Sequence, residues 1–298
     1  KASKNNMIHP KYININRILG VMTFLISFIV YFDTMAPSVS YWDCGEFIAV
    51  SYTLGVPHPP GSPLFLLLGR IASMLPISED IAFRVNLLSP LASAFAVLFL
   101  YFIIVQLVKH WRGKIETSTD ALIAFGAGVV GSMTFAFTDS HWFNAVEAEV
   151  YAFSTFFTAI VVWLALLWSE KADEQGNERY ILIIAYMIGL ATGLHLLNLL
   201  TIPFVALLIY FRKFKFEWTS FGILVALTGL VFFIIHNVII KGMPKIADAI
   251  GVVATAFLII TIFAGMVWAV LNHKYLISVV LTSMVLILIG YSTYALIF

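Results

Sequence analysis

Residues 41–70 read YWDCGEFIAVSYTLGVPHPPGSPLFLLLGR, and this stretch decides how the chain is arranged in a membrane. It follows a long apolar run over residues 17–36. It combines two carboxylates, a histidine, closely spaced prolines and an arginine in an otherwise apolar protein. Charged side chains and rigid backbone are costly at a membrane boundary, so they usually mark a functional site. The search for chemistry therefore starts in this stretch.

The composition is that of a polytopic membrane protein. Hydrophobic residues make up 61% of the 298 residues and charged residues 11%, whereas soluble domains have about 45–50% and about 25%. The formal net charge of +1 argues against a nucleic-acid-binding surface. The single cysteine, Cys44, cannot form an internal disulfide. We therefore expect an all-α fold embedded in the bilayer.

Apolar runs of about 20 residues predict membrane-spanning helices. Such runs cover residues 17–36, 84–108, 120–138, 151–168, 219–240, 248–271 and 276–297. A longer run, 181–211, is broken by Gly193–Asn198 and by Pro203. It predicts two short helices that meet at His195 and Asn198.

The run over residues 62–75 is short for a span and typical of an interfacial or re-entrant segment. If it does not cross, most lysines and arginines lie inside, and only Arg70, Arg84, Lys241 and Lys245 lie outside. If it crossed, the basic loop 109–114 would move outside and the acidic loop 139–149 inside, against the positive-inside rule. We therefore expect this segment to lie flat or to dip.

This topology gives about nine spans, an inner amino terminus and an outer carboxyl terminus. The outer face then carries a first outer loop, 37–82, with in-plane helices, and a second outer loop, 139–150. A helix break at 195–198 reaches the same face. The three segments can converge on one cavity, and residues 1–298 are treated as one transmembrane domain.

Two acidic residues precede or begin a predicted in-plane helix over about residues 44–55. Asp43 is either a helix N-cap or a general base beside the bilayer, which would deprotonate an acceptor hydroxyl. Glu46 lies three residues later, on the same face of the predicted helix. It either assists Asp43 or belongs to a solvated face.

The segment His58-Pro59-Pro60 predicts an extended turn, because each proline fixes its own φ and restrains the residue before it. The turn either holds His58 at the rim of the cavity or simply separates two helices. Arg84 opens a span, where a guanidinium can bind a lipid phosphate with paired donors. For Arg84 the alternative is snorkelling to the headgroups, which is the favoured interpretation for Arg70.

The second outer loop reads DSHWFNAVEAEVY over residues 139–151. Glu147 and Glu149 are two positions apart, so on a helix they would face apart and only one would enter the cavity. His141 and these acids could bind a divalent metal, but their spacing matches no tight ligand motif. We assign no metal and no certain cofactor. The expected cavity-lining residues are Trp42, His141, Asn144, Glu147, Glu149, Tyr151, His195 and Asn198.

Signatures of soluble nucleotide donors are missing from the sequence. It contains no Walker A motif, and its G-x-G-x-x-G match at residues 126–131 lies inside a predicted membrane span instead of between a strand and a helix. It also lacks the G-x-S-x-G nucleophile elbow of serine hydrolases. Soluble nucleotide donors are therefore poorly supported.

The order of these features resembles the GT-C superfamily of polyprenyl-phosphate-sugar glycosyltransferases. That order is a first span, an outer loop with an acidic motif, His-Pro-Pro before an interfacial helix, and an Arg-led span. Residues Trp42–Phe47 with His58–Phe65 and Leu66–Arg70 are similar to bacterial members of the protein O-mannosyltransferase-like family. The resemblance covers most of the chain and is strongest over residues 38–90.

The resemblance implies roles for individual positions. Asp43 falls at the superfamily's first-loop catalytic acid, and Glu46 would assist it or orient the acceptor. Arg84 falls where an arginine serves the lipid-linked donor. Apart from the resemblance, His58 and Arg70 are further candidates for binding the donor or its phosphate. Glu147 or Glu149 falls near the acidic position of the second outer loop, although the compact Arg-to-Asp pattern of other branches is missing. Family members usually continue into a large soluble region, which we expect to be absent here.

These expectations combine into one hypothesis. The protein would move a sugar, with mannose the first candidate, from a polyprenyl phosphate to Ser or Thr hydroxyls of exported proteins, with inversion at the anomeric carbon. Its partners would be the lipid-linked donor, the protein acceptor and the bilayer, with no nucleic acid. We expect a bacterial inner membrane and an active site on the periplasmic side. The alternatives are a transporter or flippase for lipid-linked sugars and a non-catalytic assembly subunit.

Overall fold

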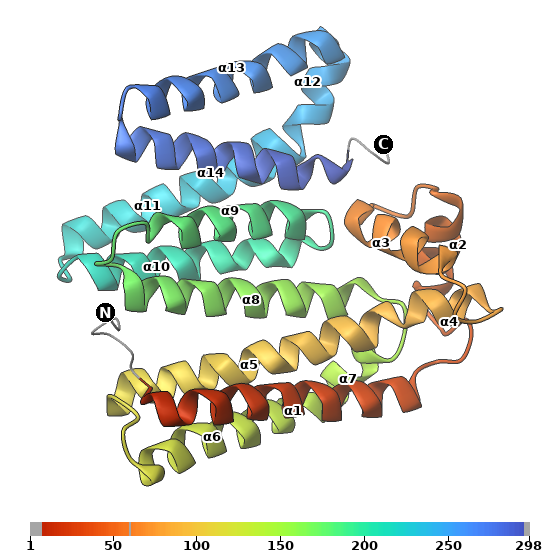
Figure 1. Ribbon diagram of the computed structural model, residues 1–298. Helices are drawn as coiled ribbons and strands as arrows, with labels where there is room; N and C mark the ends of the chain where they lie inside the picture. The colour runs from red at the N-terminus through yellow and green to blue at the C-terminus, as the bar shows by residue number, and fades with distance from the viewer. Residues whose placement is uncertain (1–7, 60, 295–298) are drawn as a thin grey trace. The chain divides into compact units, whose positions relative to one another are not determined.

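The computed structural model describes residues 8–59 and 61–294, and this part of the chain is helical without any β-strand (Figure 1). Lys1, Lys4, Pro60 and the end of the last expected span lie outside the described residues. The elements are α1 Pro10–Thr34, α2 Cys44–Thr53, α3 Pro63–Met74, α4 Ile81–Asn86, α5 Leu88–Arg112, α6 Ser118–Ala136, α7 Asp139–Ala145, α8 Val150–Lys171, α9 Glu178–Thr192, η1 Leu196–Leu200, α10 Thr201–Lys213, α11 Trp218–Phe233, η2 Ile234–Ile240, α12 Gly242–Ile250, α13 Val252–Leu271 and α14 Tyr275–Tyr291.

Six helices in the described part are long and apolar enough to cross a membrane, which confirms an all-α membrane protein. They are Pro10–Thr34, Ile81–Arg112, Ser118–Ala136, Val150–Lys171, Leu196–Lys213 and Trp218–Ile240. The other three expected spans correspond to α9, α13 and α14, which are not among these six helices. The number of nine crossings therefore stays a prediction.

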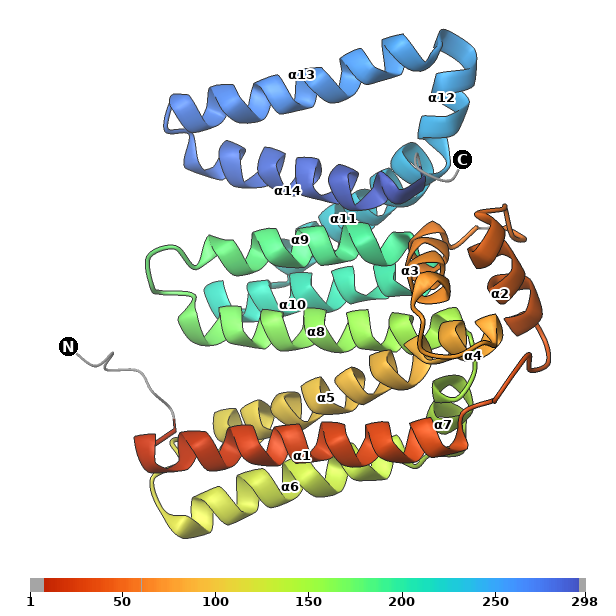
Figure 2. The ribbon, with the colours of Figure 1, turned by 45° about the vertical axis from the view of Figure 1, so that its right-hand side comes forward.

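The chain forms two compact units, residues 1–163 and 164–296, and the boundary falls within α8. In the first unit α1, α5 and α6 lie side by side (Figures 1 and 2). A Cβ at Gly128 of α6 would lie only 2.8 Å from the Tyr101 ring of α5, so this small residue lets the two helices approach closely. The Tyr31 hydroxyl of α1 donates to the Ala136 carbonyl of α6 at 2.7 Å.

Helices α2, α3 and α4 pack together within the first unit. α2 ends at Leu54, whose φ of 52° is left-handed, and α3 begins with Pro63 in its first turn. A Cβ on Gly69 of α3 would collide with Ser51 of α2, so the two helices pack through this glycine. The sequence correctly predicts both helices. Their orientation in the plane of the membrane remains a prediction.

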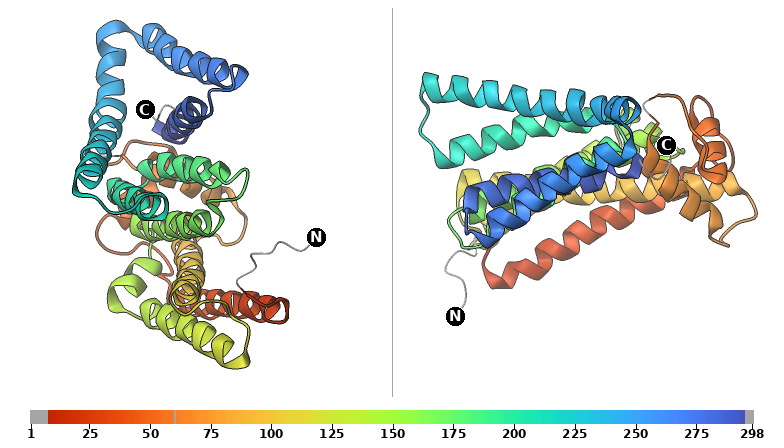
Figure 3. Two further views of the ribbon diagram at one scale, coloured as in Figure 1. Left: turned by 90° about the vertical axis from the view of Figure 1, so that its left-hand side faces the viewer. Right: turned by 90° about the horizontal axis from the view of Figure 1, so that it is seen from above.

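In the second unit α9 packs on α14, and α13 runs antiparallel to α14 (Figures 1 and 3). At the first of these contacts Gly189 lies against the backbone of Ile287, and Gly290 lies against the backbone of Gly189 and Leu190. The expected break of the 181–211 run is confirmed, because α9 ends at Thr192 and η1 starts at Leu196. His195 is the N-cap of η1, and its Nδ1 accepts from the Leu197 N–H at 3.2 Å.

Candidate active site on the outer loops

The first and second outer loops are joined by hydrogen bonds within the first unit. The Ala36 N–H donates to the Val146 carbonyl at 2.8 Å. The Ser40 hydroxyl donates to Glu147 Oε2 at 2.5 Å. Segments more than 100 positions apart in the sequence therefore meet at one place, which confirms the expectation that these two loops converge.

Asn86, at the end of α4, forms hydrogen bonds with both loops at the place where they meet. Its side chain is fully buried, and its Nδ2 donates to the carbonyls of Ala36 and Ser38, both at 2.9 Å. Its Oδ1 accepts from the Ala148 N–H at 3.1 Å. One amide thus satisfies three backbone groups from two loops, and buried backbone groups need such partners. Sequence reasoning missed Asn86, because a lone asparagine at the head of an apolar run carries no distinguishing pattern.

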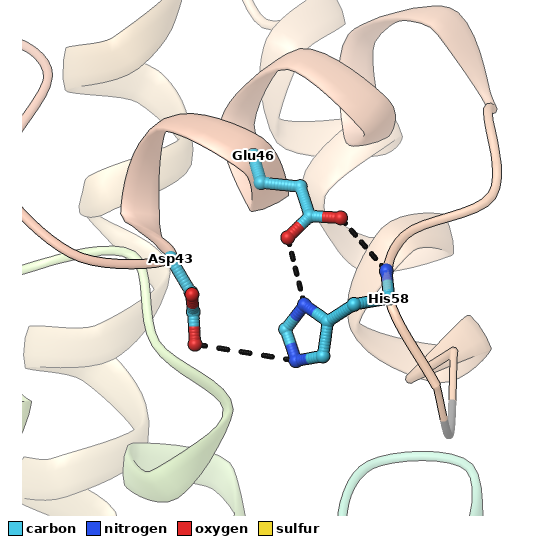
Figure 4. Close-up of side chains that lie close together, drawn as sticks. All are labelled: Asp43, Glu46 and His58. Carbon is cyan, nitrogen blue, oxygen red and sulfur yellow. Dashed lines mark hydrogen bonds and ion pairs between the residues drawn. The ribbon is translucent and has the colours of Figure 1, made fainter.

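Asp43, Glu46 and His58 come together where α2 begins (Figure 4). Glu46 binds His58 twice: Oε1 accepts from the His58 N–H at 2.7 Å, and Oε2 lies 2.7 Å from Nδ1. On the other side of the ring, Nε2 lies 4.0 Å from Asp43 Oδ2. The imidazole is therefore fixed by one carboxylate and faces the other.

Asp43 occupies the N-cap position of α2, but its side chain makes no capping hydrogen bond. Asp43 therefore has the N-cap position that the alternative interpretation expects, but its side chain does not act as the cap. The carboxylate is 57% exposed and faces His58 instead. Its negative charge is thus available to groups outside the helix.

The contact between Glu46 and His58 shifts the pKa of both side chains. The hydrogen bond that His58 donates to Glu46 is the main reason why the pKa of His58 lies above its usual value, and the charges of Glu46 and Asp43 raise it further. The same hydrogen bond lowers the pKa of Glu46. Both shifts favour an imidazolium paired with a carboxylate.

A pocket of about 210 Å³ opens beside Asp43. Among the described residues, its lining combines aromatic rings, one amide and three carboxylates, with no lysine or arginine: Trp42, Asp43, Phe143, Asn144, Glu147, Glu149 and Tyr151. Phe143 is the one lining residue that the sequence did not suggest, because an aromatic residue in a polar loop does not stand out in a chain with 26 phenylalanines.

Glu147 and Glu149 both line this pocket, contrary to the expectation that only one of them would enter. The expectation assumed a helix, but residues 147–149 lie between α7 and α8. Glu147 is 4% exposed and Glu149 6% exposed. The Cys44 thiol, which is fully buried, lies 3.9 Å from Glu149 Oε1.

Glu149 should make the stability of the protein depend on pH. Burial, and secondarily the charge of Asp43, raise its pKa to about 7; Glu147, His58 and Cys44 also lie near it. The folded protein therefore holds this proton more tightly than the unfolded chain. Its stability contribution is greatest below the ordinary carboxyl pKa, falls as the pH rises toward about 7, and is lowest above that value.

We expect Glu149→Gln to remove this dependence, so that the variant gains stability over the wild type as the pH rises from 5 to 8. The difference should reach on the order of 3 kcal/mol. Thermal unfolding of both proteins in detergent across this range measures it. The exposed Glu79→Gln is the matched control. A constant difference between Glu149→Gln and the wild type at every pH would contradict the assignment.

The two outer arginines lie elsewhere in the first unit. Arg84 Nε donates to the Ser78 carbonyl at 2.6 Å, and Nη1 to the Ser73 carbonyl at 2.8 Å. Arg70 donates to the Tyr52 carbonyl and stacks on the Tyr52 ring, 5.4 Å from its centre. Neither arginine lines the pocket beside Asp43. Binding of a lipid phosphate by Arg84 or Arg70 therefore stays a prediction.

The remaining expected residues lie apart from this pocket or in the second unit. His141 is buried in α7, 4.3 Å from the Phe135 ring, and burial lowers its pKa to about 4. It does not line the pocket. His195 and Asn198 belong to the second unit, so their expected place in the cavity also stays a prediction.

In the described part of the chain, the one cluster of side chains that could hold a divalent metal is Asp43, Glu46 and His58. The donor atoms of Asp43, Glu46 and His58 lie within 4.8 Å of one another. One ion binds one nitrogen of an imidazole, and the two carboxylates face opposite nitrogens. An ion at Nε2 would have Asp43 as its partner, with Glu46 orienting the ring from outside. Two protein ligands are fewer than tight sites use, so the contacts favour a hydrogen-bonded group.

A family model for the N-terminal domain of protein O-mannosyl-transferase TMEM260 matches residues 43–218. This range is more than half of the chain. The chain belongs to the TMEM260 family. The matched range contains Asp43, Glu46 and His58 and every residue of the pocket except Trp42.

Curated relatives in the TMEM260 family are eukaryotic. The protein O-mannosyl-transferase tmem260 of Dictyostelium discoideum is 30% identical over 228 residues, which cover 72% of this chain and 25% of the relative. The TMEM260 protein of Mus musculus is 28% identical over 199 residues, with 67% and 26% covered. The chain thus spans about a quarter of the length of these relatives. No solved structure matches it.

Proposed function

We propose that this chain is the membrane part of a glycosyltransferase that moves a sugar, with mannose the first candidate, from a polyprenyl phosphate to Ser or Thr hydroxyls of exported proteins. Membership of the TMEM260 family, whose named relatives are protein O-mannosyl-transferases, supports the reaction class. The observation that carries the proposal is the position of Asp43, which lines the pocket and also faces His58.

In the proposed reaction Asp43 is the general base. It takes the proton of the acceptor hydroxyl, whose oxygen attacks the anomeric carbon of the donor sugar. The bond between that carbon and the phosphate oxygen breaks, and the polyprenyl phosphate leaves with the bonding electrons. Because attack and departure occur on opposite faces, the configuration of the anomeric carbon inverts. A positioned base of this kind contributes about 10²–10⁴-fold to the rate.

His58 and Glu46 support this chemistry from beside the pocket. Glu46 uses both carboxylate oxygens on His58, so its role is to position the imidazole and keep it charged. The imidazolium is the cation next to Asp43 and can stabilise charge that develops on the leaving phosphate. Arg84 and Arg70 are assigned to the same phosphate. To bind the phosphate, each arginine would have to use its remaining N–H groups or give up its hydrogen bonds to backbone carbonyls.

The proposal includes a GT-C architecture of about nine crossings, with α2 and α3 in the plane of the outer membrane face. His195 and Asn198 would complete the cavity. The proposed location is a bacterial inner membrane, with the site on its periplasmic side. The excess of lysine and arginine in the loops that this topology places inside supports the orientation.

The proposed function is tested by incubating the full-length protein with several polyprenyl-phosphate sugars and a Ser/Thr-containing acceptor peptide, followed by mass spectrometry. We expect a peptide that gains one hexose from the mannose donor. Polyprenyl phosphate without sugar is the negative control. If no donor modifies the peptide while labelled donor crosses the bilayer of protein-containing vesicles, the transport alternative is correct and the proposal is wrong.

A further inference from the structure

Asp43 belongs to a short exposed segment, residues 41–43, whose side chains have little support. Tyr41 is 85% exposed and Trp42 84%. The Asp43 carboxylate makes no capping hydrogen bond to α2, and its neighbour His58 Nε2 is 4.0 Å away. A misplacement of about 1 Å can lower a catalysed rate by about 10²-fold. The residues on either side of this segment must therefore hold Asp43 in place.

The residue before the segment is held by the second outer loop. The Ser40 hydroxyl donates to Glu147 Oε2 at 2.5 Å. Glu147 is 4% exposed, and its Oε1 is buried and receives no hydrogen bond in the described part of the chain. A buried carboxylate holds such a hydroxyl strongly, since hydrogen bonds to charged groups are about twice as strong as neutral ones. Glu147 therefore fixes Ser40, three positions before Asp43.

The residue after the segment, Cys44, is held by the same loop. Its thiol is fully buried and lies 3.9 Å from Glu149 Oε1, within reach of a weak S–H hydrogen bond. Burial, and then the charges of Glu147 and Glu149, raise the pKa of Cys44, so the thiol keeps its proton and remains a donor. The two glutamates thus hold the residues on both sides of the segment.

The backbone between these two residues has the strain that two fixed ends produce. Trp42 has a φ of 57°, in the left-handed region that tryptophan rarely adopts. Such a conformation persists only where the surrounding structure imposes it. Because the Trp42 side chain is exposed, the attachment of Ser40 and Cys44 imposes it. Among the described residues, neither Ser40 nor Cys44 lines the pocket, so neither contacts a ligand there.

We propose that Glu147 and Glu149 are positioning residues that hold Asp43 in place through Ser40 and Cys44. This inference rests on the proposed function, in which Asp43 is the base. It gives the acids of the second outer loop a role in placing the base that requires no contact with a substrate. The contact of Ser40 is short and that of Cys44 long, so Ser40 should contribute more.

The first test follows the segment itself, without any substrate. Cys44 is the one cysteine of this chain and is buried, so Tyr41→Cys provides a single exposed position for a nitroxide spin label. EPR spectra in detergent then report how mobile the segment is. We expect a mainly immobile label in the wild-type background and a mainly mobile one when Ser40→Ala is added. A label at Glu79→Cys, an exposed position on the first outer loop, should not respond.

The second test follows transfer from a polyprenyl-phosphate sugar to an acceptor peptide. Ser40→Ala should lower kcat by about 10–100-fold and leave KM within about threefold, because a misplaced base slows the chemical step without weakening substrate binding. Ser40→Thr keeps the hydroxyl and should recover most of the lost rate. Cys44→Ala removes only the weaker contact and should lower kcat by about threefold. Ser140→Ala, at an exposed serine of the second outer loop, is the matched control.

Combined variants separate positioning of the base from a general loss of structure. Asp43→Asn has no base left to place, so adding Ser40→Ala should change its rate by less than about twofold. Glu147→Leu removes the acceptor of Ser40, and the two changes together should act no more strongly than either alone. If Ser40→Ala costs the same factor in Asp43→Asn as in the wild type, or raises KM instead of lowering kcat, the inference is wrong.

The two tests also separate this inference from the proposed function. If the label at position 41 is as mobile in the wild-type background as with Ser40→Ala, the inference is wrong whatever the transfer rate. If Ser40→Ala frees the label but the wild type modifies no peptide with any donor, the attachment stands and the proposed function fails. If the wild type transfers sugar and Ser40→Ala does so equally well, the proposed function stands and the inference fails.

Discussion

Replacing Asp43 with Asn should abolish sugar transfer while the amount of folded protein stays the same. The substitution keeps the shape of the side chain but removes its ability to take a proton. Because Asp43 makes no capping hydrogen bond to α2, the helix start does not depend on its charge. The expected loss is about 10²–10⁴-fold, the usual contribution of a general base. Mass spectrometry of an acceptor peptide over time measures the rate.

The matched control for this experiment is Asp139→Asn. Asp139 is an exposed residue in the first turn of α7, also on an outer loop, and it does not line the pocket. This variant should transfer sugar like the wild type. Turnover by Asp43→Asn within a factor of two of the control would show that Asp43 is not the base.

Replacing Asn86 with Ala should be among the most destabilising single changes in the first unit. The buried amide satisfies the Ala36 and Ser38 carbonyls and the Ala148 N–H, and alanine leaves all three without that partner. Buried unsatisfied groups cost about 1–3 kcal/mol each. We expect a loss of about 3 kcal/mol or more in the free energy of unfolding, measured in detergent with a chemical denaturant. Sugar transfer should fall too, because both loops lose their shared support.

Two further variants test the cause of this loss. Asn86→Asp keeps an acceptor for the Ala148 N–H but no longer donates to the two carbonyls, so its effect should be nearly as large. Asn272→Ala is the control, since Asn272 is exposed and donates only to the Trp268 carbonyl one helical turn earlier. If Asn86→Ala and Asn272→Ala lower the free energy of unfolding equally, the hydrogen bonds of Asn86 do not stabilise the contact between the two loops.

Hydrophobicity and local spacing were enough to predict the framework. Apolar runs gave the helices, and the short run over 62–75 gave α3 between two loops. Gly193 and its polar neighbours predicted the break before η1. The three-residue spacing of Asp43 and Glu46 placed both on one face of α2, where both meet His58. All of these predictions depend on residues that lie within a few helical turns of one another in the sequence, and sequence patterns describe that range.

Contacts between distant segments could not be predicted in this way. The bond from Ser40 to Glu147 joins residues 107 positions apart, and nothing in either loop specifies the other. The expectation that only one of Glu147 and Glu149 enters the cavity holds for a helix, but α7 ends at Ala145 and the chain runs irregularly to Val150. Asn86 resembled an incidental polar residue, because its importance lies entirely in its tertiary partners.

The way the outer loops are joined also limits how this protein can be engineered. Residues 36–43 cannot be transplanted alone, since their conformation depends on bonds to Val146, Glu147 and Asn86. A chimaera that exchanges acceptor or sugar preference with a relative would have to carry residues 36–58, position 86 and residues 142–151 as a single cassette. Random recombination that cuts between these segments should yield mostly inactive hybrids.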